Sequence, residues 1–309
     1  APFAWDVQHG GMAAIAAGGD PLPPALLDSI RRTRLALKGP LTTPVGGGFR
    51  SVNVRLREEF KLYANVRPAR TLIPGGRYED IDIVLVRYNV AATYEIYALS
   101  LPVALPIWMA AISSGVNTRA GSRRIAEFAF DYAVRNSRKK VTIVHKANVL
   151  KALTGIFLEA AKDVARRYEG RVAVDDRIVD ACAMQLVLDP WRFDVIVTTN
   201  LFGDILSDLV AGLVGGLGMA PGANIGRDAA IFEAVHGSAP DIAGRGVANP
   251  LALLLAAAMM LDHVGHGTTA RRVRDAIDGV LREDGVRTGD LHGRASTRDL
   301  TAALVRRLR

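Results

Sequence analysis

Short apolar runs typical of strands alternate with segments of helical periodicity from residue 141 onward, and this order constrains the fold more than any other feature. The runs cover residues 141–144, 172–174 and 193–199, and the helical segments cover residues 149–168, 178–188 and a stretch from about Gly203. Such alternation is typical of a parallel sheet flanked by its connecting helices. We therefore expect an α/β fold. No G-x-G-x-x-G sequence follows a strand, which argues against an ordinary Rossmann dinucleotide site.

Composition narrows the range of partners. Half of the 309 residues are hydrophobic, enough for a substantial core, and the net charge is +8. The basic residues are scattered and form no block interleaved with aromatics, so we expect no nucleic-acid partner; selected arginines suit a small anionic substrate better. The longest apolar run, residues 251–261, is too short to cross a bilayer, so no membrane partner is expected.

The single cysteine, Cys182, stands in an apolar helical pattern and is expected to pack as a small hydrophobic side chain. One cysteine excludes a disulfide framework, which fits a reducing compartment. Because no signal-peptide pattern is visible either, we expect a cytoplasmic protein.

Two aspartates lie four residues apart in the segment Asn200-Leu-Phe-Gly-Asp-Ile-Leu-Ser-Asp208. In a helix that begins near Gly203, Asp204 and Asp208 lie one turn apart on one face. Carboxylates this close repel each other unless a cation lies between them. The flanking leucine, isoleucine and valine residues argue against simple solvation. The spacing alone leaves two alternatives: a metal site, or acidic residues that favour the dipole of a helix N-terminus.

Three segments together resemble a known family. They are the segment just described followed by Gly215-Gly-Leu-Gly, the segment Ile231-Phe-Glu-Ala-Val-His-Gly-Ser-Ala-Pro-Asp-Ile-Ala-Gly244, and Lys38-Gly-Pro through Tyr63-Ala-Asn-Val-Arg-Pro68. Over residues 3–87 and 118–309 the sequence resembles the isocitrate and isopropylmalate dehydrogenases, and most closely the NAD-dependent isocitrate dehydrogenases.

The resemblance implies a two-domain α/β fold. A large cofactor-binding domain would be formed by residues 1–63 and 215–309, and a central domain for substrate, metal and dimerisation by residues 64–214. The family also implies a homodimer or a higher homo-oligomer.

Two regions depart from the family pattern. The strand and the Gly-Asp-Gly-Ile-Gly-Pro-Glu-like turn with which family members begin are absent, so we expect an N-terminally truncated chain without that first strand. After Arg87 the family continues with Glu-Asn-Thr-Glu, a tyrosine and a β arm that clasps the dimer partner. Residues 88–117 instead contain Pro102 and Pro106, which suit paired strands poorly. We interpret this segment as aberrant, from gene assembly or a frameshift.

The resemblance assigns the substrate, isocitrate, to Ser51, Asn53, Arg57, Arg67 and Arg87. The planar guanidinium group meets a carboxylate with two hydrogen bonds, so three arginines suit a tricarboxylate. In the family the Ser-x-Asn pair marks enzymes that hold the extra carboxylate of isocitrate, whereas isopropylmalate enzymes have apolar residues there. The segment Gly46-Gly-Gly-Phe-Arg-Ser51 therefore favours isocitrate, with homoisocitrate next.

Two residues take catalytic positions by resemblance. Lys146 follows the run at 141–144 and corresponds to the lysine that assists deprotonation of the C2 hydroxyl, a role that requires a lowered pKa. Tyr94 has the spacing from Arg87 of the tyrosine that protonates the product enolate.

The resemblance also resolves the open alternatives for the two aspartates. Asp180 corresponds to a third metal carboxylate beside Asp204 and Asp208, and the ion would be Mg²⁺ or Mn²⁺ acting as a Lewis acid. In the family Lys146 and Asp180 are typically contributed to the cleft of the neighbouring subunit, so activity would require a dimer.

The expected cofactor is NAD. By resemblance its binding residues are Asn148, His236, Gly237, Ser238, Ala239, Pro240, Asp241, Ile242 and Asn249. Asp241 can accept hydrogen bonds from the ribose hydroxyls and would repel a 2′-phosphate. NADP enzymes of the family usually carry Lys and Tyr where this chain has Asp241-Ile242. Without the family context, His236 would be read as a buried structural histidine and Asp241 as a loop cap.

These assignments predict NAD-dependent oxidative decarboxylation of isocitrate to 2-oxoglutarate and CO₂. The alternatives are a homoisocitrate or 3-isopropylmalate dehydrogenase, a non-catalytic regulatory subunit, or an inactive fragment of this family. Regulatory subunits tend to lose the metal aspartates or the catalytic lysine, and this chain retains all four.

Overall fold

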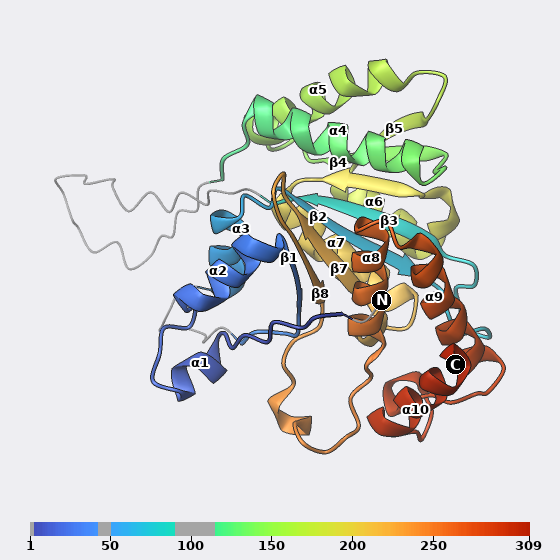
Figure 1. Ribbon diagram of the computed structural model, residues 1–309. Coiled ribbons are helices and arrows are strands. Elements are labelled where there is room, and N and C mark those ends of the chain that lie inside the picture. Colours follow the sequence, from blue (N-terminus) through green and yellow to red (C-terminus); the bar gives the residue numbers. More distant parts are fainter. Residues whose placement is uncertain (1–2, 43–50, 90–114) are drawn as a thin grey trace, which may run out of the picture.

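The computed structural model describes residues 3–42, 51–89 and 115–309 (Figure 1). Within these ranges eight strands form one sheet in the order β1-β8-β7-β2-β3-β6-β4-β5. Strand β2 runs antiparallel to β3 and β7, and β7 runs antiparallel to β8; the other neighbours are parallel. The strands are β1 (Leu35–Lys38), β2 (Ala64–Arg70), β3 (Asp82–Tyr88), β4 (Lys140–His145), β5 (Ala173–Ile178), β6 (Val195–Thr198), β7 (Pro221–Ile225) and β8 (Ala230–Ala234).

Helices connect and cover these strands. They are α1 (Met12–Ala16), α2 (Pro24–Thr33), α3 (Val52–Glu59), α4 (Arg119–Arg135), α5 (Lys151–Ala165), α6 (Val179–Leu188), α7 (Asn200–Leu213), α8 (Leu251–His263), α9 (Gly267–Arg282) and α10 (Thr297–Leu308). The alternation expected from the sequence is present as β4-α5-β5-α6-β6-α7, and the α/β fold is confirmed.

One boundary differs from the expectation. Helix α7 begins at Asn200, three residues before Gly203, because the extended backbone of Thr199 already places its carbonyl to accept from the Gly203 N–H at 2.9 Å. Asp204 is therefore the fifth residue of the helix and lies beyond its first turn.

Helices α4, α5 and α8 pack on one face of the sheet (Figure 1). Alternate residues of the central strands reach this face, among them Val66, Val84 and Val197. The intervening residues, such as Leu85 and Ile196, reach the opposite face, where α6 and α7 cover them. Both faces of the inner strands are buried, so the middle of β3 (residues 83–86) and most of β6 (residues 195–197) are apolar.

The opposite face has a second apolar cluster at the β1 end of the sheet. There α2 and α3 pack on Ile231 of β8, with Leu56 and Leu62 beside it. On this face of the sheet, α7 covers one apolar part and α3 covers another, and polar residues lie between the two parts. These polar residues form the site described below.

Two further expectations concern the core and membranes. Cys182 lies buried in α6, and burial raises the pKa of its thiol to about 12, so it packs as a hydrophobic residue as expected.

In the described ranges we find no helix with the length and apolar character needed to cross a membrane. The division into domains 1–63 with 215–309 and 64–214 stays a prediction.

Candidate active site

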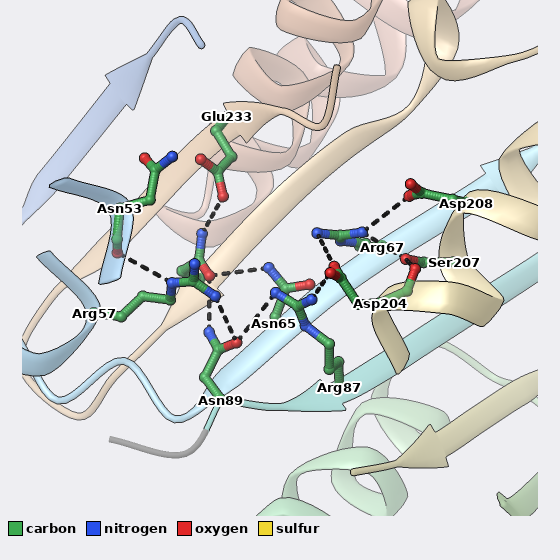
Figure 2. A network of polar contacts seen from close by, with 11 residues as sticks. Asn53, Arg57, Asn65, Arg67, Arg87, Asn89, Asp204, Ser207, Asp208 and Glu233 are labelled. Carbon is green, nitrogen blue, oxygen red and sulfur yellow. Dashed lines mark hydrogen bonds and ion pairs between the residues drawn. The ribbon is translucent and has the colours of Figure 1, made fainter. Parts of the chain in front are cut away.

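Polar side chains form a row across one face of the sheet. Arg87 on β3 lies opposite Asn65 on β2, and Asn65 lies opposite Asn224 on β7. On the next two strands Glu233 of β8 lies opposite Lys38 of β1. Because side chains alternate along a strand, all five point away from α4, α5 and α8. Figure 2 shows the site above this row, with α3 on one side and α7 on the other.

Arg67 and Arg87 connect the sheet to α7 (Figure 2). Arg87 Nη1 donates to Asp204 Oδ1, and Arg67 Nη2 lies 3.3 Å from the same oxygen. Arg67 Nη1 also donates to Ser207 Oγ at 2.5 Å and lies 3.3 Å from Asp208 Oδ1. The two arginines and the two aspartates therefore form one ion-pair network.

Arg57 approaches the network from α3. Its Nε donates to the backbone carbonyl of Asn53 at 3.1 Å, and its Nη1 donates to Asn89 Oδ1 at 3.3 Å. Arg87 Nη2 donates to the same Asn89 oxygen at 3.4 Å. The structure thus brings together the three arginines that the resemblance assigned to the substrate.

The three cations lie in a poorly solvated place. Burial lowers the pKa of Arg87 to about 10, and the positive charge of Arg67 lowers it as well, against the opposing effect of Asp204. Burial also lowers the pKa of Arg57. Both groups remain charged at neutral pH, because an arginine gives up its proton only far above it. Burial and mutual repulsion both make the positive charges of these arginines unfavourable. An anionic ligand would relieve this cost, so the site favours one.

Hydrogen-bonding capacity remains in the site. Arg67 Nε, Arg87 Nε and Asn53 Oδ1 are buried, and the described residues offer them no hydrogen-bond partner. A cavity of about 200 Å³ adjoins them, lined by Lys38, Asn53, Arg57, Arg67, Arg87, Glu233, His236 and Gly237 among others. A buried donor without an acceptor costs about 1–3 kcal/mol, so a carboxylate that reached these N–H groups would be strongly stabilised.

Asp204 and Asp208 lie on successive turns of α7, and their side chains are 59 % and 56 % exposed. The expectation that apolar neighbours keep solvent away is therefore wrong. Leu206 and Val210 point from another face of the helix into the core and do not cover the carboxylates. Partial burial nevertheless raises the pKa of Asp208, against the opposing effect of Arg67.

The donor set of Asp204 and Asp208 fits a hard divalent cation, because both offer carboxylate oxygens that solvent and ligands can reach. In the part of the chain that the structure describes, no three His, Cys, Asp or Glu side chains lie close enough together to hold a metal ion. Asp180 therefore does not join the other two aspartates within one chain.

Lys146 and Asp180 instead pair with each other. Strands β4 and β5 are parallel, so Lys146, which follows β4, and Asp180, in the first turn of α6 after β5, lie at the same edge of the sheet. Lys146 Nζ lies 2.6 Å from Asp180 Oδ1, and this hydrogen bond holds the pKa of Asp180 below its ordinary value. The Asp180 side chain is 67 % exposed and thus open to a partner.

The segment assigned to the cofactor forms an exposed loop beside the cavity. His236 and Gly237 line the cavity, and Ser238 Oγ lies 2.8 Å from the donor Thr42 Oγ1. Ala239 adopts a left-handed backbone with φ of 43°, which turns the chain into the short 3-10 helix Pro240–Ile242.

The other cofactor residues lie apart from this loop. Asn249 Oδ1 accepts from the Leu251 N–H at 3.0 Å and thereby begins α8, while its Nδ2 donates to Asp290 at 2.9 Å. Asn148 is exposed in the turn after β4.

Some assigned residues lie at or beyond the limits of the described chain. Ser51 immediately precedes α3, so it belongs to the edge of the site that Asn53 lines. Tyr94 and residues 46–50 lie outside the described residues, as does most of the segment 88–117.

Sequence reasoning assigned no role to five residues of the site: Lys38, Asn65, Asn89, Asn224 and Glu233. Lys38 and Glu233 stand within segments that carried the family resemblance, so their charges were a usable signal. Asn65 also stands in such a segment, but Asn89 and Asn224 do not, and only the pairing register of β2, β3 and β7 brings the three asparagines together.

A family profile described as isocitrate/isopropylmalate dehydrogenase matches residues 1–304. The chain belongs to this family. The solved isocitrate dehydrogenase of Methylococcus capsulatus, a structure with the same fold, superposes with a TM-score of 0.92 at 54 % identity, covering 99 % of this chain and 91 % of that one.

Relatives with assigned names divide among three substrates. A probable NAD isocitrate dehydrogenase subunit alpha from Drosophila melanogaster is 44 % identical over 93 % of this chain and 75 % of that protein. An isocitrate/homoisocitrate dehydrogenase from Thermus thermophilus is 49 % identical over 94 % of this chain and 85 % of that protein. A 3-isopropylmalate dehydrogenase from Archaeoglobus fulgidus is 44 % identical over 96 % of this chain and 87 % of that protein. Membership of the dehydrogenase family alone therefore does not choose the substrate.

Proposed function

We propose that this member of the isocitrate/isopropylmalate dehydrogenase family oxidises and decarboxylates isocitrate to 2-oxoglutarate and CO₂, using NAD and a divalent cation. The observation that carries the proposal is the set of three arginines around one small cavity, with two buried N–H groups left without an acceptor among the described residues. A tricarboxylate would satisfy these groups.

The polar rim of the cavity favours isocitrate over 3-isopropylmalate. Asn53 lines the cavity, and its buried Oδ1 lacks a partner in the described chain. An isopropyl group placed against Asn53 would leave this oxygen unpaired, at a cost of about 1–3 kcal/mol. The extra carboxylate of isocitrate could be hydrogen-bonded there.

The residues of this chain would divide the chemistry between them. Arg57, Arg67 and Arg87 hold the carboxylates and fix the orientation of C2. Lys146 takes the proton of the C2 hydroxyl as the hydrogen on C2 leaves with its electron pair. In the described chain Lys146 pairs with Asp180, and Asp180 would release it by turning to a cation.

Bound cofactors would supply the remaining chemistry. Asp204 and Asp208, with Asp180 from a partner subunit, would hold Mg²⁺ or Mn²⁺ in a homodimer or a higher oligomer. When bound, the cation supplies a Lewis acid for decarboxylation and NAD supplies the hydride acceptor. The acidic Asp241 on the exposed loop supports NAD rather than NADP. A single buried thiol suits a reducing compartment such as the cytoplasm.

The test is NADH formation by the purified protein with Mn²⁺ and each of isocitrate, homoisocitrate and 3-isopropylmalate. We expect turnover with isocitrate, and we expect Asp204→Asn to lower kcat at least about a hundredfold, because it removes a carboxylate and weakens the ion pairs with Arg67 and Arg87. Folded protein that turned over none of the three substrates would instead favour a regulatory subunit or an inactive fragment.

A further inference from the structure

Side-chain amides connect the substrate arginines to Glu233 on strand β8, across the same face of the sheet (Figure 2). Asn89 Oδ1 accepts from both Arg57 and Arg87, and Asn89 Nδ2 donates to Asn224 Oδ1 at 2.8 Å. Asn224 Nδ2 in turn donates to Glu233 Oε1 at 2.6 Å. Both asparagines are almost completely buried, at 2 % and 3 % exposed.

The two ends of this chain of hydrogen bonds determine its direction. A guanidinium group can only donate, so the oxygen of Asn89 must face Arg57 and Arg87, and its NH₂ group must face Asn224. An ionised carboxylate can only accept, so Glu233 requires the NH₂ group of Asn224. Lys38 Nζ, 2.5 Å from the other Glu233 oxygen, keeps that carboxylate ionised. Every bond therefore points from the arginines toward Glu233.

Asn65 also holds Asn224 in place, from the neighbouring strand β2. Its Nδ2 donates to the same Asn224 oxygen at 2.9 Å, from a strand position directly opposite both Asn224 and Arg87. Asn224 is thus fixed by three partners, none of which is an arginine. In a buried network of this kind, removing one member leaves its partners unpaired at a high cost.

We propose that Asn89 and Asn224 form a polarised amide relay that positions Arg57 and Arg87 for the carboxylates of the substrate. The inference rests on the proposed function, since it concerns the same site. Arg57 and Arg87 repel each other, and the shared oxygen of Asn89 holds them at one separation without neutralising either. Asn224 is a positioning residue: it contacts neither arginine, and its effect reaches them only through Asn89.

Asn224→Asp tests the relay at its centre. The substitution preserves the size of the side chain and its acceptor for Asn65 and Asn89, but it places a carboxylate against Glu233. We expect the affinity for Mg²⁺-isocitrate, measured by calorimetry without NAD, to fall about tenfold or more, since one lost charged hydrogen bond accounts for roughly that factor. KM for isocitrate should rise more than kcat falls.

The second substitution Glu233→Gln provides a rescue. In the double variant Asn224→Asp/Glu233→Gln, the new amide at position 233 can donate to the new carboxylate at position 224. Asn65 and Asn89 still donate to that carboxylate, so the bonds on the arginine side keep their direction, and the bond between positions 224 and 233 is restored with its direction reversed. We expect the double variant to recover most of the lost isocitrate affinity. Recovery would not follow if Asn224 only filled space.

Tyr168→Phe is the control, because it also removes a side-chain hydrogen bond, the partly buried one to Asp131 at 2.7 Å, but lies with α5 on the other face of the sheet. We expect lower thermal stability and unchanged isocitrate affinity. The relay is overturned if folded Asn224→Asp binds isocitrate as tightly as the original chain, or if the double variant binds no better than the single one. If the original chain binds none of the three 2-hydroxy acids, the proposed function fails instead.

Discussion

Arg87 is the most constrained functional side chain of the site. It is 4 % exposed, donates to Asp204 and Asn89, and lies under the first turns of α7. Gly203 makes this packing possible, since a Cβ there would lie 2.5 Å from Arg87 Cγ and 2.8 Å from its Cβ. These are atoms close to the backbone that cannot swing aside, so the glycine and the arginine are sterically coupled.

Gly203→Ala should therefore destabilise the protein and displace Arg87. We expect unfolding by urea to show a loss of about 1–3 kcal/mol, as for other overpacked core sites, together with a raised KM for isocitrate. Gly212→Ala on the same helix is the control. A Cβ there meets nothing within 4 Å, so it should stabilise α7 by about 0.5–1 kcal/mol. Equal effects of the two substitutions would contradict the steric argument.

Glu233 provides a prediction about pH. Burial tends to raise the pKa of its carboxyl, but the ion pair with Lys38 and hydrogen bonds from Lys38 and Asn224 outweigh this and lower it below the ordinary 4.5. A carboxyl whose pKa is lowered by folding adds stability above its unfolded value, and this stability is lost as pH falls through the folded value.

Glu233→Gln should accordingly cost about 3 kcal/mol at neutral pH, the order expected when one partner of a buried ion pair is removed. The difference from the original chain should shrink as pH falls below 4.5. Urea unfolding of both proteins between pH 7 and pH 3 measures this difference in unfolding free energy. The exposed Glu159→Gln, in a surface pair with Arg119, should show a small difference throughout; a constant Glu233→Gln difference across this range would refute the assignment.

At the scale of elements, the sequence predicted what depends on local periodicity. The strands near 141–144 and 193–199 and the helix near 178–188 lie where the apolar patterns indicated. The asparagine relay was not predictable in this way, because Asn65, Asn89 and Asn224 share no local pattern. They meet only through the antiparallel register of β2 with β3 and β7. The exposure of Asp204 likewise depends on how α7 rotates against the sheet.

The C-terminal helix α10 carries a capping box. Ser296 Oγ accepts from the Asp299 N–H at 3.1 Å, and Asp299 accepts from the Ser296 backbone at 3.0 Å. Ser296→Ala should lower stability by about 1 kcal/mol without changing KM for isocitrate, since α10 packs on α9 away from the cavity. Thermal unfolding and steady-state kinetics of the same preparation check both parts, and a changed KM would argue against an independent element.

At the scale of the whole molecule, the two halves of the proposed chemistry lie apart in one chain. Lys146 pairs with Asp180, while Asp204 and Asp208 belong to the arginine network. If a partner subunit supplies Lys146 and Asp180, two inactive variants can complement each other. Lys146→Met mixed and refolded with Asp204→Asn should recover about a quarter of the original activity, because half of the dimers are mixed and each has one intact site. No recovery from folded, mixed dimers would place the whole site in one chain.

The central claim is that three arginines and a polar rim select isocitrate. The most direct measurement is kcat/KM for isocitrate and for 3-isopropylmalate, with NAD and Mn²⁺ at one pH and ionic strength. We predict a ratio of at least about a hundred in favour of isocitrate, because the unpaired polar groups around the cavity penalise an apolar substituent. A ratio near one, or one that favoured 3-isopropylmalate, would contradict this account of the site.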